Sequence, residues 1–225
     1  EHHYRVRMRI EAVLNSAKLK GWRTGENPAI WRGGLEAALP RISKVKRVQH
    51  HPALPWQDAP VFMKALKARE GISPRALELC VLTATRSGEV RKATWSEIDL
   101  GNGLWIIPAD RMKAGREHRV PLCNAAIELL KQIPRIARCD LIFPGTRNQP
   151  LSDMTLGAVL KRMGLGHYTV HGFRSTFRDW AAENTNHASE VVEMALAHTV
   201  GNKVEAAYRR GDLLAKRCAL MDDWA

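Results

Sequence analysis

Hydrophobic positions follow a helical period along most of the chain. Apolar residues recur at intervals of three and four over six segments, which predicts an amphipathic helix in each: 4–19, 56–69, 74–85, 124–132, 152–163 and 212–224. Asn27-Pro28 is typical of a helix start, so a further helix is expected to end at Leu39, before Pro40. Ser73-Pro74 predicts a start of the same kind for the helix that ends at Thr85.

Two short runs instead favour β-structure. Residues 104–107 (LWII) and 118–122 (HRVPL) flank a loop that contains Lys113 and Gly115, which predicts an antiparallel hairpin. Leu141-Ile142-Phe143 is expected to add a short third strand. The predicted fold class is therefore mainly α with a small antiparallel β-sheet (α+β).

The pattern changes around residue 50. Residues 40–55 combine three prolines with four Lys/Arg and show little periodicity, which is typical of an interdomain linker. We place a linker at 40–52 and a large domain at 53–225. The helices of residues 1–39 can bury little core alone, so they are interpreted as the C-terminal part of a further helical domain.

The charge of the chain changes the functional picture. The net charge is +12 and the pI is about 10.0, and residues 1–50 hold 11 Lys/Arg against 4 Asp/Glu. This excess fits a polyanion such as DNA or RNA, although charge alone is equally typical of a soluble basic protein. The linker side chains expected to contact DNA are Lys44, Lys46 and Arg47.

Several functional classes are disfavoured. The four cysteines are scattered without a CxxC pair, which predicts reduced thiols and no metal site. No run approaches 18 apolar residues, and the N-terminus is polar and basic, so neither a membrane span nor a signal peptide is expected.

Candidate chemistry centres on the stretch from His171 to Tyr208. A helix that begins at residue 171 places His171 and Arg174 on one face, where an imidazole and a guanidinium suit a phosphate. A second helical run over 189–197 ends at His198, and a third from Asn202 contains Tyr208. Each residue alone also has an ordinary explanation: a core histidine, a surface arginine, a helix C-cap or a tyrosine at the edge of the core.

Arg86 and Lys113 are similarly weak signals when each is considered alone. Arg86 follows a buried helix, where an arginine usually forms an ion pair, and Glu89 is expected to pair with a nearby cation. Lys113 in a hairpin loop is typical of an ordinary surface lysine, yet a lysine there can also act as a general acid. The ordered set of all six residues, at sensible separations, favours a common function.

This set resembles the tyrosine recombinases, the phage-lambda-type integrases, and within them the integrases of satellite prophages and genomic islands. The resemblance spans essentially the whole chain through the phrases ATRSGEV, MKAGREHRVPL, HGFRSTFR, LAH and KVEAAYRR. It implies that 53–225 is the catalytic domain and that 1–39 ends a core-binding domain. The chain departs from the common family phrases at Ala84 and Ala197, where those phrases have glycine, and Tyr208 lies ten rather than nine residues beyond His198.

The resemblance also implies roles for the residues. Tyr208 is the nucleophile that forms a 3′-phosphotyrosyl link, and His171 accepts its proton. Arg86, Arg174 and His198 bind the phosphate, and Lys113 is the general acid. Arg116 and Arg119, beside Lys113, are expected to contact DNA. No metal, cofactor or ATP is expected, since the chain shows no acidic cluster for two metals and no phosphate-binding glycine loop.

The implied partners are attachment sites in double-stranded DNA, a homotetramer on that DNA, and an excisionase and DNA-bending host factors. The implied location is the bacterial cytoplasm, at the nucleoid. Leu213, Leu214 and Leu220 either dock on a neighbouring subunit or pack within their own. Two further readings remain: a type IB topoisomerase, and a catalytically idle DNA-binding regulator on the same scaffold. A basic RNA-binding module is disfavoured because interleaved aromatic residues are lacking.

Overall fold

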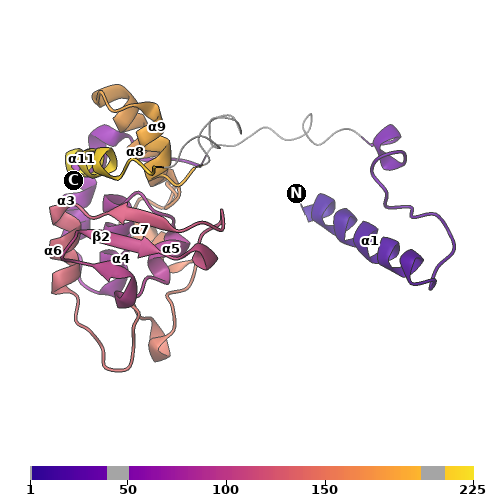
Figure 1. Cartoon of the computed structure of the whole chain (residues 1–225), viewed down its shortest axis with the longest axis horizontal. Helices are drawn as coiled ribbons and strands as arrows, with labels where there is room; N and C mark the ends of the chain where they lie inside the picture. The colour runs from indigo at the N-terminus through magenta and orange to yellow at the C-terminus, as the bar shows by residue number, and fades with distance from the viewer. Residues whose placement is uncertain (1, 40–50, 199–210) are drawn as a thin grey trace. The chain divides into compact units, whose positions relative to one another are not determined.

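The computed structural model describes residues 2–39, 51–198 and 211–225 (Figure 1). The chain forms two compact units, Glu1–His50 and His51–Ala225. Among the described residues, no helix combines the length and the apolar character that crossing a membrane requires.

The first unit contains one long helix, α1 (His2–Leu19), as predicted. The prediction of a second helix, from Asn27-Pro28 to Leu39, is wrong. The residues after 27 form turns and a single 3-10 turn, Leu35–Ala37. Gly33 has a left-handed φ of 74°, which interrupts helix propagation. Asn27 does bind the N–H of Ala29 through its side-chain oxygen, but its amide nitrogen donates back to Asn15 of α1, so it joins the loop to α1.

The second unit contains the remaining described helices. Its chain passes from a 3-10 turn, Trp56–Asp58, through the helices in this order: α3 (Ala59–Lys67), α4 (Ile72–Leu82), α5 (Ser87–Arg91), α6 (Asn124–Gln132), α7 (Thr155–Arg162), α8 (Gly172–Asn184), α9 (Ser189–Ala195) and α11 (Leu214–Trp224). The helices predicted from periodicity are confirmed, with small differences at their ends. Ser73 and Pro74 lie inside the first turn of α4, because Gly71 is its N-cap residue.

The sheet has three antiparallel strands in the order β1 (Ile98–Asp99), β2 (Leu104–Ile107) and β3 (His118–Pro121). The predicted hairpin is confirmed as β2–β3, in which Trp105 lies opposite Val120. The predicted strand at 141–143 is wrong, because Leu141 forms only an isolated bridge with Thr94. The third strand is β1 instead. The predicted class, mainly helical with a small antiparallel sheet, is confirmed.

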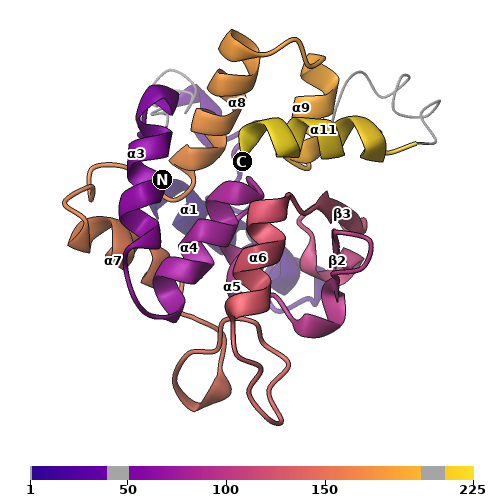
Figure 2. The same ribbon diagram turned by 90° about the vertical axis from the view of Figure 1, so that its left-hand side faces the viewer.

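Two hydrophobic clusters form the core of this unit. The larger surrounds α4, which is buried along most of its length and contacts α3, α5, α6 and α7. The smaller joins α8, α9 and α11 through residues such as Phe177, Val192 and Leu220. Figures 1 and 2 show these three helices together at one end of the unit, next to α4 and the sheet. This layering brings the start of α8 and the end of α9 beside the turn that follows α4.

The start of α8 also packs against the chain at residues 52–54. The N–H of Thr169 and the hydroxyl of Thr176 donate to the carbonyls of Pro52 and Leu54 at 3.0 and 2.6 Å. A Cβ on Gly172 would lie 2.2 Å from the Pro52 carbonyl oxygen. Only a glycine therefore fits at the first position of α8.

We expect Gly172→Ala to lower the free energy of unfolding by about 1–3 kcal/mol, because backbone must move to admit the methyl group. Gly157→Ala is the matched control. Gly157 lies inside α7 with open space at its Cβ position, so this change should raise stability by about 0.5–1 kcal/mol. Urea unfolding of both variants measures the difference, and an equal response of the two would contradict the close packing at Gly172.

Candidate active site

Arg86 is the N-cap residue of α5, directly after the turn that ends α4. Its guanidinium donates from Nη1 to Glu89 Oε1 at 2.8 Å, and its backbone N–H donates to Glu89 Oε2 at 2.7 Å. Nη2 reaches the carbonyl of Ala197 at 3.3 Å. The expected pairing of Glu89 with a cation is thus confirmed, and the paired carboxylate fixes Arg86 beside the end of α9.

Arg174 lies in the first turn of α8 and is only 5% exposed. Its Nη1 donates to the carbonyl of Ala84, and its Nη2 donates to the carbonyl of Leu196 and lies 3.0 Å from His198 Nε2. Burial, followed by the nearby Arg86, lowers the pKa of Arg174 to about 10. The group is therefore still a cation at neutral pH, and within the described part of the chain its partners are carbonyls and a ring nitrogen, not a carboxylate.

His171 is the N-cap residue of α8 and is exposed. Its ring meets the ring of His51 edge-on, with centroids 4.7 Å apart. Burial is the main cause that lowers the pKa of His171, and repulsion from His51, Arg174 and Arg86 adds to it. A lowered pKa keeps the imidazole neutral at pH 7, so the ring is able to accept a proton.

His198 follows α9 and is bound through both ring nitrogens. Nδ1 lies 2.6 Å from Glu193 Oε2, and Nε2 lies 3.0 Å from Arg174 Nη2. The other carboxylate oxygen of Glu193 accepts from Arg178 Nε at 2.6 Å. Although burial of Glu193 opposes it, hydrogen bonds from Arg178 and His198 lower the pKa of this carboxyl, so Glu193 is an anion at neutral pH.

The structure therefore brings four predicted residues together, and we call Arg86, His171, Arg174 and His198 the arginine–histidine cluster. Three of them are linked through shared contacts on the turn after α4 and the end of α9. His171 is close enough to the other three for their charges to act on its ring. Two fixed cations beside a neutral imidazole form a site for an oxyanion such as phosphate.

Two alanines in this region have an unusual backbone. Ala84 and Ala197 both have a φ of 49°, a left-handed conformation that favours glycine. Their carbonyls accept from Arg174 and Arg86, respectively. The left-handed turns thus aim two carbonyls at the two guanidiniums.

Ala197→Gly is expected to raise the free energy of unfolding by about 0.5–1 kcal/mol, because glycine relieves the left-handed strain at a partly exposed site. Ala84 is 2% exposed, so Ala84→Gly also loses a buried methyl group worth about 0.8 kcal/mol and should be nearly neutral. Urea unfolding tests both variants. A destabilised Ala197→Gly protein would argue against strain at this turn.

Of the remaining predicted residues, those that the structure describes lie outside this cluster. Lys113 and Arg116 are exposed in the turn between a 3-10 turn, Ala109–Arg111, and β3. Arg119 on β3 forms an ion pair with Asp212 at 2.7 Å, a contact that the sequence did not suggest. Four predicted residues lie outside the described residues: Lys44, Lys46, Arg47 and Tyr208.

Asp212 lies just before α11 and is bound by two arginines. Its carboxylate also accepts from Arg217 of α11 at 2.7 Å, and Arg217, 1% exposed, donates to the backbone carbonyls of Asp212 and Arg119. Sequence reasoning missed Arg217 because an arginine within an amphipathic helix is expected on its exposed face. It also missed His51 and Glu193, since their roles depend on contacts that spacing alone does not reveal.

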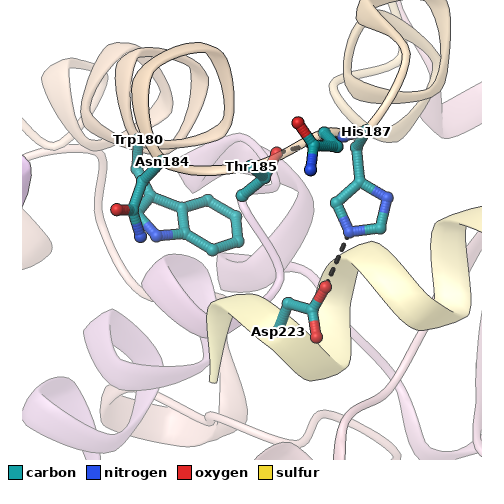
Figure 3. Close-up of a pocket in the computed structure, with 6 residues that line it drawn as sticks. Trp180, Asn184, Thr185, His187 and Asp223 are labelled. Carbon is teal, nitrogen blue, oxygen red and sulfur yellow. Dashed lines mark hydrogen bonds and ion pairs between the residues drawn. The ribbon is translucent and has the colours of Figure 1, made fainter.

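A cavity of about 560 Å³ lies elsewhere, between the end of α8 and α11 (Figure 3). Trp180, Asn184 and His187 are among its lining residues, and His187 Nε2 lies 2.7 Å from Asp223 Oδ2. None of the cluster residues lines it. We interpret this cavity as part of the contact between α11, the end of α8 and the loop that follows α8.

Comparison with known proteins gives a consistent picture. Residues 54–213 match the family model described as "Phage integrase family". The chain is 36% identical over 203 residues to the prophage integrase IntA of Escherichia coli K12, an alignment that covers 85% of this chain and 49% of that protein. It is 32% identical over 242 residues to the integrase of enterobacteria phage P4, which covers 98% of this chain and 53% of the relative. The chain thus spans about half the length of the curated relatives it matches.

The fold also matches solved structures. A lambda integrase in a tetramer bound to a Holliday junction superposes with a TM-score of 0.60 at 20% identity, covering 88% of this chain and 58% of the other. The integrase of mycobacterium phage Brujita gives a TM-score of 0.59 at 18% identity, covering 99% of this chain and 71% of the other. The expected recombinase catalytic-domain fold is thereby confirmed.

Proposed function

The chain belongs to the phage integrase family, and from that premise we propose that it is part of a site-specific DNA recombinase that cleaves and rejoins DNA through a 3′-phosphotyrosyl intermediate. The observation that most supports this is Arg174, a buried cation held by carbonyls next to a second guanidinium. A buried positive charge of this kind is best stabilised by an anion, and a DNA phosphate supplies one.

In the proposed reaction, the hydroxyl oxygen of Tyr208 attacks a DNA phosphorus, and the bond from phosphorus to the 5′-oxygen breaks. His171 takes the phenol proton, because its neutral ring is an acceptor. Arg86 and Arg174 donate to the non-bridging oxygens, where charge increases in the transition state. Lys113 gives a proton to the departing 5′-oxygen. A 5′-hydroxyl of the partner strand then attacks the phosphotyrosine and releases Tyr208.

We propose residues 53–225 as the catalytic domain, 40–52 as a basic linker and 1–39 as the end of a core-binding domain. The separation of the described chain into two compact units supports a boundary near residue 50. Arg116 is proposed to contact DNA together with Lys44, Lys46 and Arg47. For Arg119 we propose a weaker contribution, since its guanidinium already pairs with Asp212.

The proposed substrates are paired attachment sites, through which a prophage or genomic island is integrated or excised, and the proposed assembly is a tetramer on DNA. The similarity to a lambda integrase tetramer on a Holliday junction supports an assembly of this kind. A type IB topoisomerase-like activity is the alternative; it needs no pair of specific sites. A catalytically idle regulator would bind the sites without cleaving them.

The test is a nicked duplex that contains the candidate attachment site, incubated with the protein in EDTA without ATP and resolved on a denaturing gel. A covalent protein–DNA band supports the proposal. Relaxation of supercoiled plasmid without attachment sites would favour the topoisomerase instead. Binding without a covalent band, in this chain and in a form extended to the length of its relatives, would favour the regulator.

A further inference from the structure

The hydrogen bonds of His198 determine which of its ring nitrogens carries the proton. Arg174 has only donors, so His198 Nε2, at 3.0 Å from Nη2, must accept. The proton of the neutral ring is therefore on Nδ1, which donates to Glu193 Oε2 at 2.6 Å. In this state the nitrogen that faces Arg174 carries a lone pair.

That state does not suit the proposed role of His198 in phosphate binding. A lone pair on Nε2 repels a phosphate oxygen, whereas a ring protonated on both nitrogens donates to it. The doubly protonated ring is a cation, and an adjacent carboxylate stabilises a cation. Glu193 is the carboxylate that contacts His198, and its side chain is only 21% exposed, so solvent screens the pair incompletely.

Resting on the proposed function, we propose that Glu193 is a positioning residue for His198. It holds the imidazole with Nδ1–H directed at its carboxylate, and it stabilises the doubly protonated ring that donates Nε2–H to the DNA phosphate. When the phosphate binds, Arg174 Nη2 turns its hydrogen bond from the ring to a phosphate oxygen, and His198 takes one proton from solvent. Glu193 itself touches no substrate.

Other charged groups also act on this ring. Arg174 Nη2 lies 3.0 Å from Nε2. Arg178 competes for Glu193 through the other carboxylate oxygen. Among the residues that the structure describes, the charged and titratable groups around His198 are Glu193 on α9, Arg174 and Arg178 on α8, His171 before α8, and Arg86 with its partner Glu89 on α5. Of these, Glu193 is the anion in contact with the ring.

The prediction concerns the rate of covalent adduct formation on the nicked duplex. Glu193→Gln keeps a hydrogen-bond acceptor for Nδ1–H but removes the charge that faces the ring. We expect this variant to form the adduct about tenfold more slowly with saturating DNA, because the ring that donates to the phosphate loses the adjacent anion.

Arg178→Gln is the matched control. It removes the ion pair between Arg178 and Glu193 but leaves Glu193 in contact with His198. Glu193 then has no second cation from Arg178 that competes with the ring. Its rate of adduct formation should therefore stay close to that of the wild-type protein. If Glu193 merely tied α9 to α8 through Arg178, both variants would respond alike, and that result would overturn the inference.

A second measurement does not depend on cleavage. Long-range ¹⁵N–¹H spectra of histidine-labelled protein identify which ring nitrogen carries the proton. We expect Nδ1–H for the neutral ring of His198, and an Nε2–H ring would overturn the inference. Failure of the proposed function is distinguishable, because the wild-type protein would then form no adduct at any pH, and this inference would fall with it.

Discussion

Tyr208→Phe is expected to form no covalent adduct with a nicked attachment-site duplex, while it binds that duplex about as well as the wild-type protein. Phenylalanine keeps the ring but lacks the oxygen that is proposed to attack phosphorus. The residues proposed to bind the phosphate are Arg86, Arg174 and His198, which this change leaves in place. A gel-shift titration and a denaturing gel on the same samples measure binding and attachment separately.

The chain offers a matched control in Tyr168, one of its three tyrosines. Tyr168 packs partly buried against the main core, with its ring 4.0 Å from that of His167, and it has no assigned role in chemistry. Tyr168→Phe should retain the adduct. Attachment that persists in Tyr208→Phe, or that disappears equally in both variants, would refute the assignment of Tyr208 as the nucleophile.

Tyr208 lies outside the described residues, so its assignment depends on the phrase KVEAAYRR and not on a contact. The described residues on either side are nevertheless well held. His198 is bound by Glu193 and Arg174, and Asp212 is bound by Arg119 and Arg217. His198 thus belongs to the arginine–histidine cluster itself, and Asp212 is held by β3 and α11.

The helices and the hairpin were predictable because their signals are local. The predicted bounds of the helix at 124–132 and of the strand at 104–107 match the structure, since each has a clear period and a loop at both ends. The strand predicted at residues 141–143 was wrong for the opposite reason. Ile142 and Phe143 are fully buried in the main core, so their apolar character reflects tertiary packing. The actual third strand, Ile98–Asp99, is two residues long and shows no alternation.

The candidate site was predictable as a list of residues but not as a network. Order and local phrases selected Arg86, His171, Arg174 and His198, and the structure brings them together. The groups that hold them were not predictable in the same way. Glu193 is one of two glutamates on α9, and the carbonyls of Ala84 and Ala197 have no sequence signal beyond a glycine in related phrases. Contacts between distant segments decide those roles.

Arg174→Lys is expected to slow adduct formation by about 10²–10³-fold under single-turnover conditions with saturating DNA. Lysine keeps the positive charge but loses the planar fork that donates in two directions at once. Arg174 uses that fork to bind the carbonyls of Ala84 and Leu196 and still reach His198. An ammonium cannot hold both carbonyls and a phosphate oxygen in this geometry, so stabilisation of the transition state is lost.

Lysine is chosen because Arg174→Ala would leave two buried carbonyls unpaired, at about 1–3 kcal/mol each, and loss of folding would then obscure the result. Arg178→Lys is the matched control: it lies one turn later on α8 with its side chain 57% exposed, and it should change the rate only a few-fold. Thermal unfolding of both variants checks that the fold persists. If a folded Arg174→Lys protein reacted at a rate close to that of Arg178→Lys, the guanidinium would not be clamping the phosphate, and the oxyanion site would have to lie elsewhere in the chain.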